Sequence, residues 1–180
     1  MAGDALVVVD MQVGLLDGAP KYDLAGVVRR INALASMVRA GGGAVVWIRH
    51  CGNADDGFAP QTPGWSFLPD LEHRTGDVVV DKTLNDAFAG TPLHDTLRRL
   101  APDRILIAGW ATDFCVDTTI RSAVSHDYDV VVVSDGHTLS DRPHLAAPDI
   151  IRHHNWVWAG LLTNRSIRVA TTAELTAAAR

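Results

Sequence analysis

Three reactive side chains follow apolar runs whose length and composition are typical of buried strands. Asp10, Lys82 and Cys115 each come at the end of such a run or shortly after it. A cysteine thiolate is a strong nucleophile, and a carboxylate can take up the thiol proton and later deliver it to a leaving group. An ammonium group beside the sulfur would lower the pKa of the thiol. The three residues therefore predict nucleophilic catalysis through sulfur.

The local sequence around Cys115, GWATDFCVDTT, predicts a strand end that passes directly into a helix. A thiol in the first turn lies near the positive end of the helix dipole, so we expect the helix and Lys82 together to lower its pKa. Unpaired backbone N–H groups in the same turn could bind an oxyanion.

Each residue taken alone also has a purely structural interpretation. A free cysteine is often a buried space-filling residue, an aspartate after a strand often caps a turn, and a lone lysine is usually solvated. The functional interpretation depends on all three lying at strand ends. Cys51, the other cysteine, has neither a helix start nor a nearby lysine and is not predicted to react.

Apolar runs alternate with segments of helical period along the whole chain. Helices are predicted from Leu24 to about Ala40 and over Leu93–Leu100, 113–125 and His144–Leu161. The predicted strands are Ala5–Val9, Ala44–Ile48, Val78–Val80, Ile105–Ala108, Val130–Val133 and Ile167–Ala170. Strands that are apolar on both faces and separated by helices indicate a doubly wound parallel sheet in a three-layer α/β/α sandwich. Ligands of such sheets bind beyond the carboxyl ends of the strands, where the three reactive residues are expected.

Composition predicts one globular domain over residues 1–180. The chain is 47% hydrophobic, with a net charge of −5 and no cluster of like charges, which argues against nucleic acid and acidic membranes as partners. The N-terminal apolar run is too short for a signal peptide, and no stretch approaches a membrane span. We expect a cytoplasmic protein.

The segment from His50 to Asp77 lacks a strong hydrophobic period and is expected to be a lid or binding loop.

Three motifs, in this order, resemble the isochorismatase-like cysteine hydrolases, a group that includes nicotinamidases and N-carbamoylsarcosine amidohydrolases. They are VVVDMQ, the lysine in DKTLNDAFAGTPL, and GWATDFCVDTTIRSA. The resemblance implies a six-stranded sheet and a catalytic triad of Asp10, Lys82 and Cys115. It also implies a cis peptide between Trp110 and Ala111, an oxyanion hole formed by the N–H groups of Ala111 and Cys115, and a homodimer or homotetramer.

The retained cysteine favours hydrolysis of a small amide, lactam or ureido C–N bond through a thioester. One member of the family opens the lactam of streptothricin, and the resemblance permits that substrate. Two alternatives stay open: a vinyl-ether hydrolase acting on isochorismate, and a catalytically silent binding scaffold. A dinucleotide-binding module is disfavoured because no G-x-G-x-x-G follows the first strand.

Four aromatic residues lie in or beside loops at the predicted active edge and are expected to line a substrate pocket, with core packing as the alternative: Trp65, Phe88, Trp110 and Phe114. His50 is expected in the same pocket or loop, and Leu15 is added because the resemblance implies a pocket position that is often Phe in the family. We predict no metal and no other cofactor. Related nicotinamidases carry Asp-x-His after the second strand, whereas this chain has Ile48 and His50, and His73 adds no carboxylate.

Four further polar residues have no place in the predicted chemistry. His137 either faces the site or anchors a loop, and we expect the second. His153, His154 and Asn155 lie on the predicted long helix, where neighbours point about 100° apart and cannot readily share one ion. An oligomer contact or a buried helix end is expected there.

Overall fold

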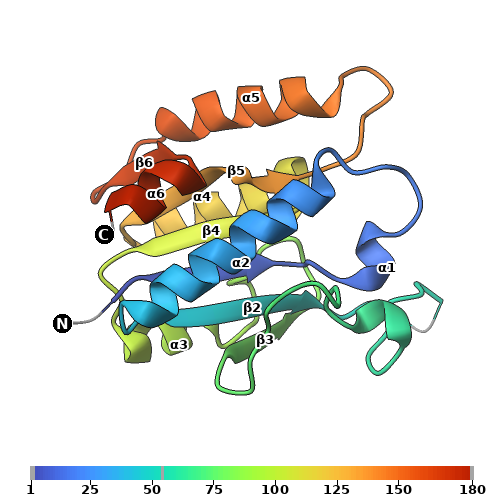
Figure 1. The fold of residues 1–180 in the computed structure, drawn as a ribbon, viewed down its shortest axis with the longest axis horizontal. Helices are drawn as coiled ribbons and strands as arrows, with labels where there is room; N and C mark the ends of the chain where they lie inside the picture. The colour runs from blue at the N-terminus through green and yellow to red at the C-terminus, as the bar shows by residue number, and fades with distance from the viewer. Residues whose placement is uncertain (1–2, 54, 179–180) are drawn as a thin grey trace.

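The computed structural model describes residues 3–53 and 55–178, which form a six-stranded, all-parallel sheet (Figure 1). The strands are β1 (Ala5–Val9), β2 (Ala44–His50), β3 (Val78–Lys82), β4 (Ile105–Trp110), β5 (Val130–Thr138) and β6 (Ile167–Ala170). Their order in the sheet is β3-β2-β1-β4-β5-β6. The chain starts in the middle of the sheet, extends to one edge, and then returns to build the other half.

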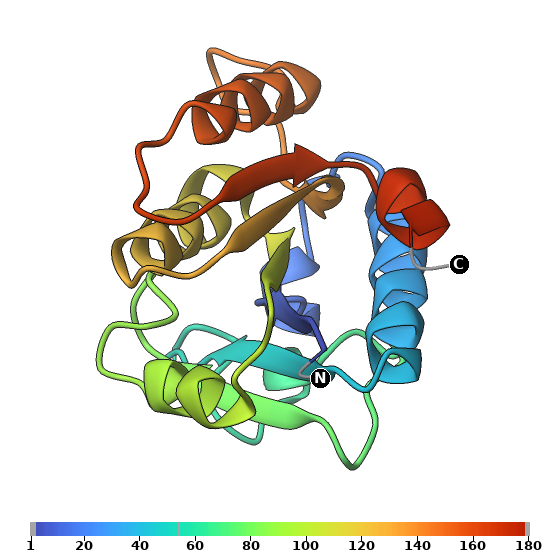
Figure 2. The ribbon, with the colours of Figure 1, turned by 90° about the vertical axis from the view of Figure 1, so that its left-hand side faces the viewer.

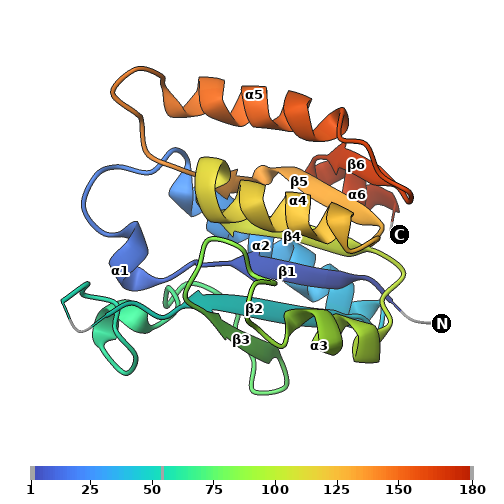
Figure 3. The ribbon, with the colours of Figure 1, turned by 180° about the vertical axis from the view of Figure 1, so that it is seen from behind.

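Helices cover both faces of the sheet, as Figures 2 and 3 show. One face packs against α2 (Leu24–Ala40) and α6 (Thr172–Ala178), and the other against α3 (Leu93–Leu100), α4 (Asp117–Ser125) and α5 (Ala147–Ala159). Each face buries its own cluster of mostly Val, Ile and Leu side chains. The predicted three-layer α/β/α sandwich with a doubly wound parallel sheet is therefore confirmed. The single-domain prediction over residues 1–180 stays a prediction, and residues 1, 2, 54, 179 and 180 lie outside the described residues.

Several predicted boundaries need correction. Four strands run beyond their apolar segments, so that His50 and Lys82 are paired residues of β2 and β3 rather than loop residues. The last long helix starts at Ala147 instead of His144, because Pro148 occupies its first turn, where a missing N–H costs nothing. Three short helices were not predicted: α1 (Val13–Leu16), η1 (Pro63–Trp65) and α6.

The close approach of β4 to β1 fixes the position of the central strand end. Gly109 pairs with Val9 and has a φ of 129°, and a Cβ atom there would collide with the Val9 carbonyl oxygen. Asp10 follows with a φ of 52°, a left-handed conformation that aspartate tolerates better than most residues. The backbone at this edge is thus shaped by one glycine and one aspartate in conformations that most residues avoid.

Candidate active site

The structure brings Asp10, Lys82 and Cys115 together at the carboxyl edge of the sheet. Asp10 directly follows β1, Lys82 ends β3, and Cys115 lies in η2 (Thr112–Val116), a π-helical turn between β4 and α4. Lys82 Nζ lies 2.6 Å from Asp10 Oδ2 and 3.4 Å from Cys115 Sγ. The side chains of Asp10 and Lys82 are fully buried, while Cys115 is half-buried.

The Lys82 ammonium group has a defined set of acceptors. It donates hydrogen bonds to the carbonyl oxygen of Leu84 at 2.9 Å and to Cys115 Sγ at 3.4 Å, and it forms an ion pair with Asp10. These three contacts surround the ammonium group. Lys82 is therefore held in one orientation, and its charge lies between the carboxylate and the sulfur.

The pKa of Cys115 departs from the prediction made from sequence. Burial, together with the negative charge of Asp10, raises the pKa of the thiol to about 12, and the opposing effect of Lys82 is smaller. Burial likewise raises the pKa of Asp10, although Lys82 and Cys115 act in the opposite direction. The expectation that helix and ammonium would lower the thiol pKa is wrong, because it left out desolvation and the adjacent carboxylate. A thiol with a pKa of about 12 is protonated at neutral pH.

The turn that carries Cys115 is closed by the backbone of Ala111. The peptide between Trp110 and Ala111 is cis. The Ala111 carbonyl accepts hydrogen bonds from the N–H groups of Phe114 and Val116, the residues on either side of Cys115. Ala111 itself is buried directly beside the sulfur-bearing turn. The oxyanion hole predicted from the N–H groups of Ala111 and Cys115 stays a prediction.

Gln12 was not among the predicted site residues, yet it organises this edge of the sheet. Its buried side chain accepts a hydrogen bond from the N–H of His50 at 2.6 Å. It also donates to the carbonyl oxygens of His50 and Trp65, at 2.9 and 3.1 Å. Gln12 therefore joins the end of β1 to the end of β2 and to η1. The VVVDMQ motif contained this residue, but only the structure reveals its partners.

Two of the predicted substrate-binding residues lie on segments that Gln12 joins. His50 is half-buried, and burial and the charge of Lys82 lower its pKa. Its ring contacts Phe58 at 5.5 Å between centroids. Trp65 donates its indole N–H to Cys51 Sγ at 3.3 Å, and the Arg49 guanidinium lies 3.3 Å from the Trp65 ring centroid. Both residues lie at the same edge of the sheet as Asp10.

The other predicted pocket residues divide into two groups. Phe114, beside Cys115, is 51% exposed, and Trp110 and Leu15 are half-buried. Phe88 is different, because it is buried and its ring contacts His126 and Tyr128 at 5.0 and 5.9 Å. Phe88 therefore belongs to the core rather than to the predicted pocket.

Metal binding finds no ready set of ligands in the residues that the structure describes. Within 3–53 and 55–178, no three His, Cys, Asp or Glu side chains gather as a metal site requires. His73 instead packs against Trp47 and Phe67, at 5.7 and 5.4 Å between ring centroids.

No helix within residues 3–53 and 55–178 is both long and apolar enough to cross a membrane.

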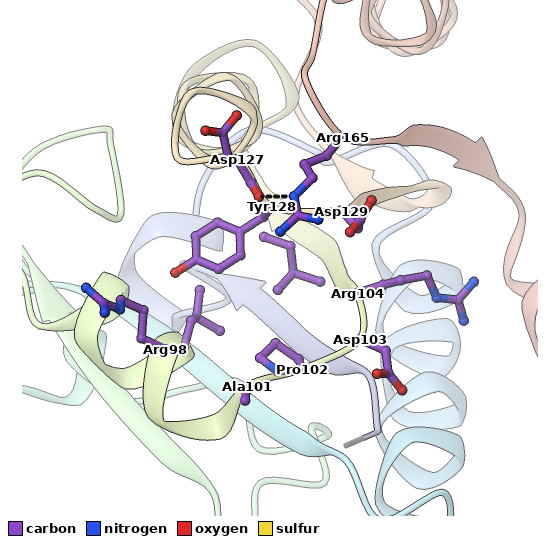
Figure 4. A pocket seen from close by; sticks show the side chains of 11 residues that line it. Arg98, Ala101, Pro102, Asp103, Arg104, Asp127, Tyr128, Asp129 and Arg165 are labelled. Carbon is purple, nitrogen blue, oxygen red and sulfur yellow. Dashed lines mark hydrogen bonds between the residues drawn. The ribbon is translucent and has the colours of Figure 1, made fainter. Parts of the chain in front are cut away.

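A separate cavity of about 180 Å³ lies at the amino end of the sheet (Figure 4). It is lined by residues that precede β4 and β5, including Pro102, Asp103 and Tyr128, so it lies away from Cys115. Arg165 and Arg104 at this cavity are already engaged, by the Asp127 carbonyl and the Asp4 carboxylate. The cavity therefore has no part in the chemistry of Cys115.

Comparison with known proteins identifies the family of the chain. A family model described as the isochorismatase domain matches residues 4–157. The chain belongs to the isochorismatase family. The resemblance predicted from the three motifs is thereby confirmed.

Relatives of this isochorismatase family member are named for different hydrolase activities. Two streptothricin hydrolases of Streptomyces noursei are 36% and 35% identical to it over 147 residues, 81% of this chain. The chain spans only 58% and 52% of their lengths. A ureidoacrylate amidohydrolase of Methylorubrum extorquens is 26% identical over 184 residues, covering 82% of this chain and 72% of that protein. The solved structure of a cysteine hydrolase from Pseudomonas syringae pv. phaseolicola is 28% identical, with a TM-score of 0.88 over 98% of this chain and 92% of that one.

Proposed function

We propose that the chain is a cysteine-dependent hydrolase of a small amide, lactam or ureido C–N bond. The observation that carries the proposal is the buried cluster in which Lys82 Nζ contacts both Asp10 Oδ2 and Cys115 Sγ. The names of its relatives, streptothricin hydrolase and ureidoacrylate amidohydrolase, support a C–N substrate. By resemblance alone, we also propose a homodimer or homotetramer.

The reaction begins with attack of Cys115 Sγ on the carbonyl carbon of the substrate. The thiol proton passes to Asp10, whose own raised pKa suits it to hold a proton for a time. The tetrahedral oxyanion is stabilised by the backbone N–H groups of Ala111 and Cys115. The C–N bond then breaks, the nitrogen leaves with the proton from Asp10, and the carbonyl carbon remains bound to sulfur as a thioester.

Hydrolysis completes the cycle. Water gives a proton to Asp10 and adds its oxygen to the thioester carbonyl, and the C–S bond breaks. The Asp10 proton returns to the sulfur, which restores the thiol. Throughout, Lys82 keeps one positive charge beside an anion that moves between carboxylate, sulfur and oxyanion. This role needs a fixed ammonium group, and its two hydrogen bonds and its ion pair with Asp10 hold Lys82 in place.

The test is a panel of primary amides, lactams and ureido acids, including streptothricin and ureidoacrylate, scored for release of a new amine or ammonia. Cys115→Ala should abolish turnover, with a loss of at least ~1,000-fold. Cys51→Ser replaces the other half-buried thiol but keeps an acceptor for the Trp65 indole N–H, so it is the matched control, with turnover expected to stay near the wild-type level.

A third variant, Cys115→Ser, and the wild-type protein distinguish the alternatives. Hydrolysis of isochorismate that survives Cys115→Ser would replace the amide proposal by vinyl-ether chemistry. Wild-type protein without turnover on any substrate of either class would favour a binding scaffold.

A further inference from the structure

Behind the turn that carries Cys115, a buried chain of polar side chains runs from η2 through β5 to α5. Thr112 Oγ1 lies 2.9 Å from His137 Nδ1, and His137 Nε2 lies 3.2 Å from Asn155 Oδ1. Thr112 and His137 are essentially inaccessible to solvent. None of the three residues has a role in the proposed chemistry, yet buried polar groups of this kind are costly unless they are fully bonded.

The direction of each hydrogen bond in this series of side chains follows from the contacts of Asn155, its last member. Its Nδ2 donates to the Ser134 carbonyl at 2.9 Å, so the amide must present Oδ1, an acceptor, to His137. His137 Nε2 therefore carries the ring proton. Burial lowers the pKa of His137 to about 4, so the ring is neutral and Nδ1 is an acceptor. The Thr112 hydroxyl group consequently donates to Nδ1.

A second contact from α5 reaches the other end of the same turn. Trp158 is fully buried and packs edge-on against His137, with 5.1 Å between ring centroids. Its indole N–H donates to Asp117 Oδ1 at 2.7 Å, and Asp117 is the first residue of α4. Helix α5 lies on the same side of the sheet as α4 (Figure 3). Thr112 precedes Cys115 by three positions and Asp117 follows it by two, so α5 holds the turn on both sides of the sulfur.

We infer that Thr112, His137 and Asn155 are positioning residues, which fix the nucleophile turn from behind so that Cys115 Sγ stays in contact with Lys82 and Asp10. The inference rests on the proposed function, in which that geometry is used for attack on a carbonyl. A displacement of the sulfur by a fraction of an ångström would weaken the reaction far more than it weakens substrate binding.

The test uses two variants of Thr112. Thr112→Val keeps the size of the side chain and removes the hydroxyl group, and Thr112→Ser keeps the hydroxyl group. For Thr112→Val we expect kcat to fall ~10- to 100-fold with KM nearly unchanged, because only the reacting geometry is lost. Thr112→Ser should recover most of kcat. If Thr112→Val does not fold, Asn155→Leu removes the hydrogen bond to His137 instead. This variant should also lower kcat and leave KM nearly unchanged.

Tyr128→Phe is the matched control. It removes another hydroxyl–imidazole contact, that of Tyr128 Oη with His94 Nδ1 at 3.0 Å, beside the cavity at the far end of the sheet. This variant should leave kcat and KM at wild-type values whatever its effect on stability.

A substrate-independent measurement separates this inference from the proposed function. Hydrogen exchange at the N–H groups of Phe114 and Val116, both bonded to the Ala111 carbonyl, reports directly on the turn. It should become faster in Thr112→Val and remain slow in Thr112→Ser and Tyr128→Phe, even if no amide substrate is turned over. Unchanged exchange in Thr112→Val, or faster exchange without any loss of kcat on a working substrate, would overturn the inference.

Discussion

At the scale of single residues, Asp10 has two opposing effects on Cys115. Its negative charge raises the pKa of the thiol, and in the proposed reaction its carboxylate takes up the thiol proton. Substitution Asp10→Asn should therefore separate reactivity from turnover. The thiolate reacts with iodoacetamide, so the variant's sulfur, which then has Lys82 as its only charged neighbour in the cluster, should be alkylated at least ~10-fold faster at mildly alkaline pH. Amide turnover should fall by ~100-fold or more, because the acid–base group is gone.

Alkylation rates are measured against pH in a Cys51→Ala background, so that the label reports Cys115 alone. In the parent protein the rate should still be rising at pH 10, since the thiol pKa is about 12. A parent rate that levels off near neutrality would contradict the raised pKa of the thiol, and an Asp10→Asn variant that is alkylated more slowly would contradict the contribution of the Asp10 charge to it.

At the scale of elements, the contact between β1 and β4 sets the edge on which the site is built. Gly109→Ala would force a Cβ atom against the Val9 carbonyl oxygen and impose a φ that alanine rarely adopts. We expect the free energy of unfolding to fall by about 3 kcal/mol or more, measured by urea denaturation. Gly42→Ala is the matched control, because Gly42 has a φ of 76° but nothing within 4 Å of the added Cβ. Its cost should be near 1 kcal/mol, and equal costs for the two variants would exclude the collision as the cause.

The helices and strands also show how much of the fold could be predicted from the sequence. Runs of Val and Ile predicted all six strands, because burial on both faces leaves a plain apolar signal. Their carboxyl ends were missed where polar residues such as His50 and Lys82 continue the pairing. The π-helical form of η2 was also missed, since the spacing of apolar residues does not distinguish its period over a single turn.

In the candidate site, too, some features could be predicted from the sequence and others could not. Asp10, Lys82 and Cys115 were predicted because they follow apolar runs whose ends must meet at one edge. The partners of Gln12 and the chain from Thr112 to Asn155 could not be predicted, because they join segments far apart in sequence through single hydrogen bonds. The predicted direction of the Cys115 pKa shift was wrong for a related reason. The balance between the effects of Lys82, Asp10 and burial depends on distances that the sequence does not contain.

At the scale of the whole molecule, the neutral His137 in the core makes stability depend on pH. Burial lowers the pKa of His137 from 6.5 to about 4 in the folded protein. Between these values the unfolded chain binds a proton at this histidine and the folded protein does not, so stability is lost as the pH falls from about 6.5 to 4. One pKa unit corresponds to about 1.4 kcal/mol, and the loss from His137 should therefore be on the order of 3 kcal/mol.

Other groups titrate in the same range, so the prediction concerns a difference between two proteins. The raised pKa of buried Asp10 acts in the opposite sense, because the folded protein takes up that proton more readily than the unfolded chain. His137→Gln should be less stable than the wild type at neutral pH, because it disturbs the contacts to Thr112 and Asn155, but it should lose less stability on acidification. Urea denaturation of both proteins at several pH values measures this. Parallel curves would mean that His137 takes up a proton as readily in the folded protein as in the unfolded chain, so that below about pH 6.5 the Thr112 hydroxyl would face a donor instead of an acceptor at Nδ1.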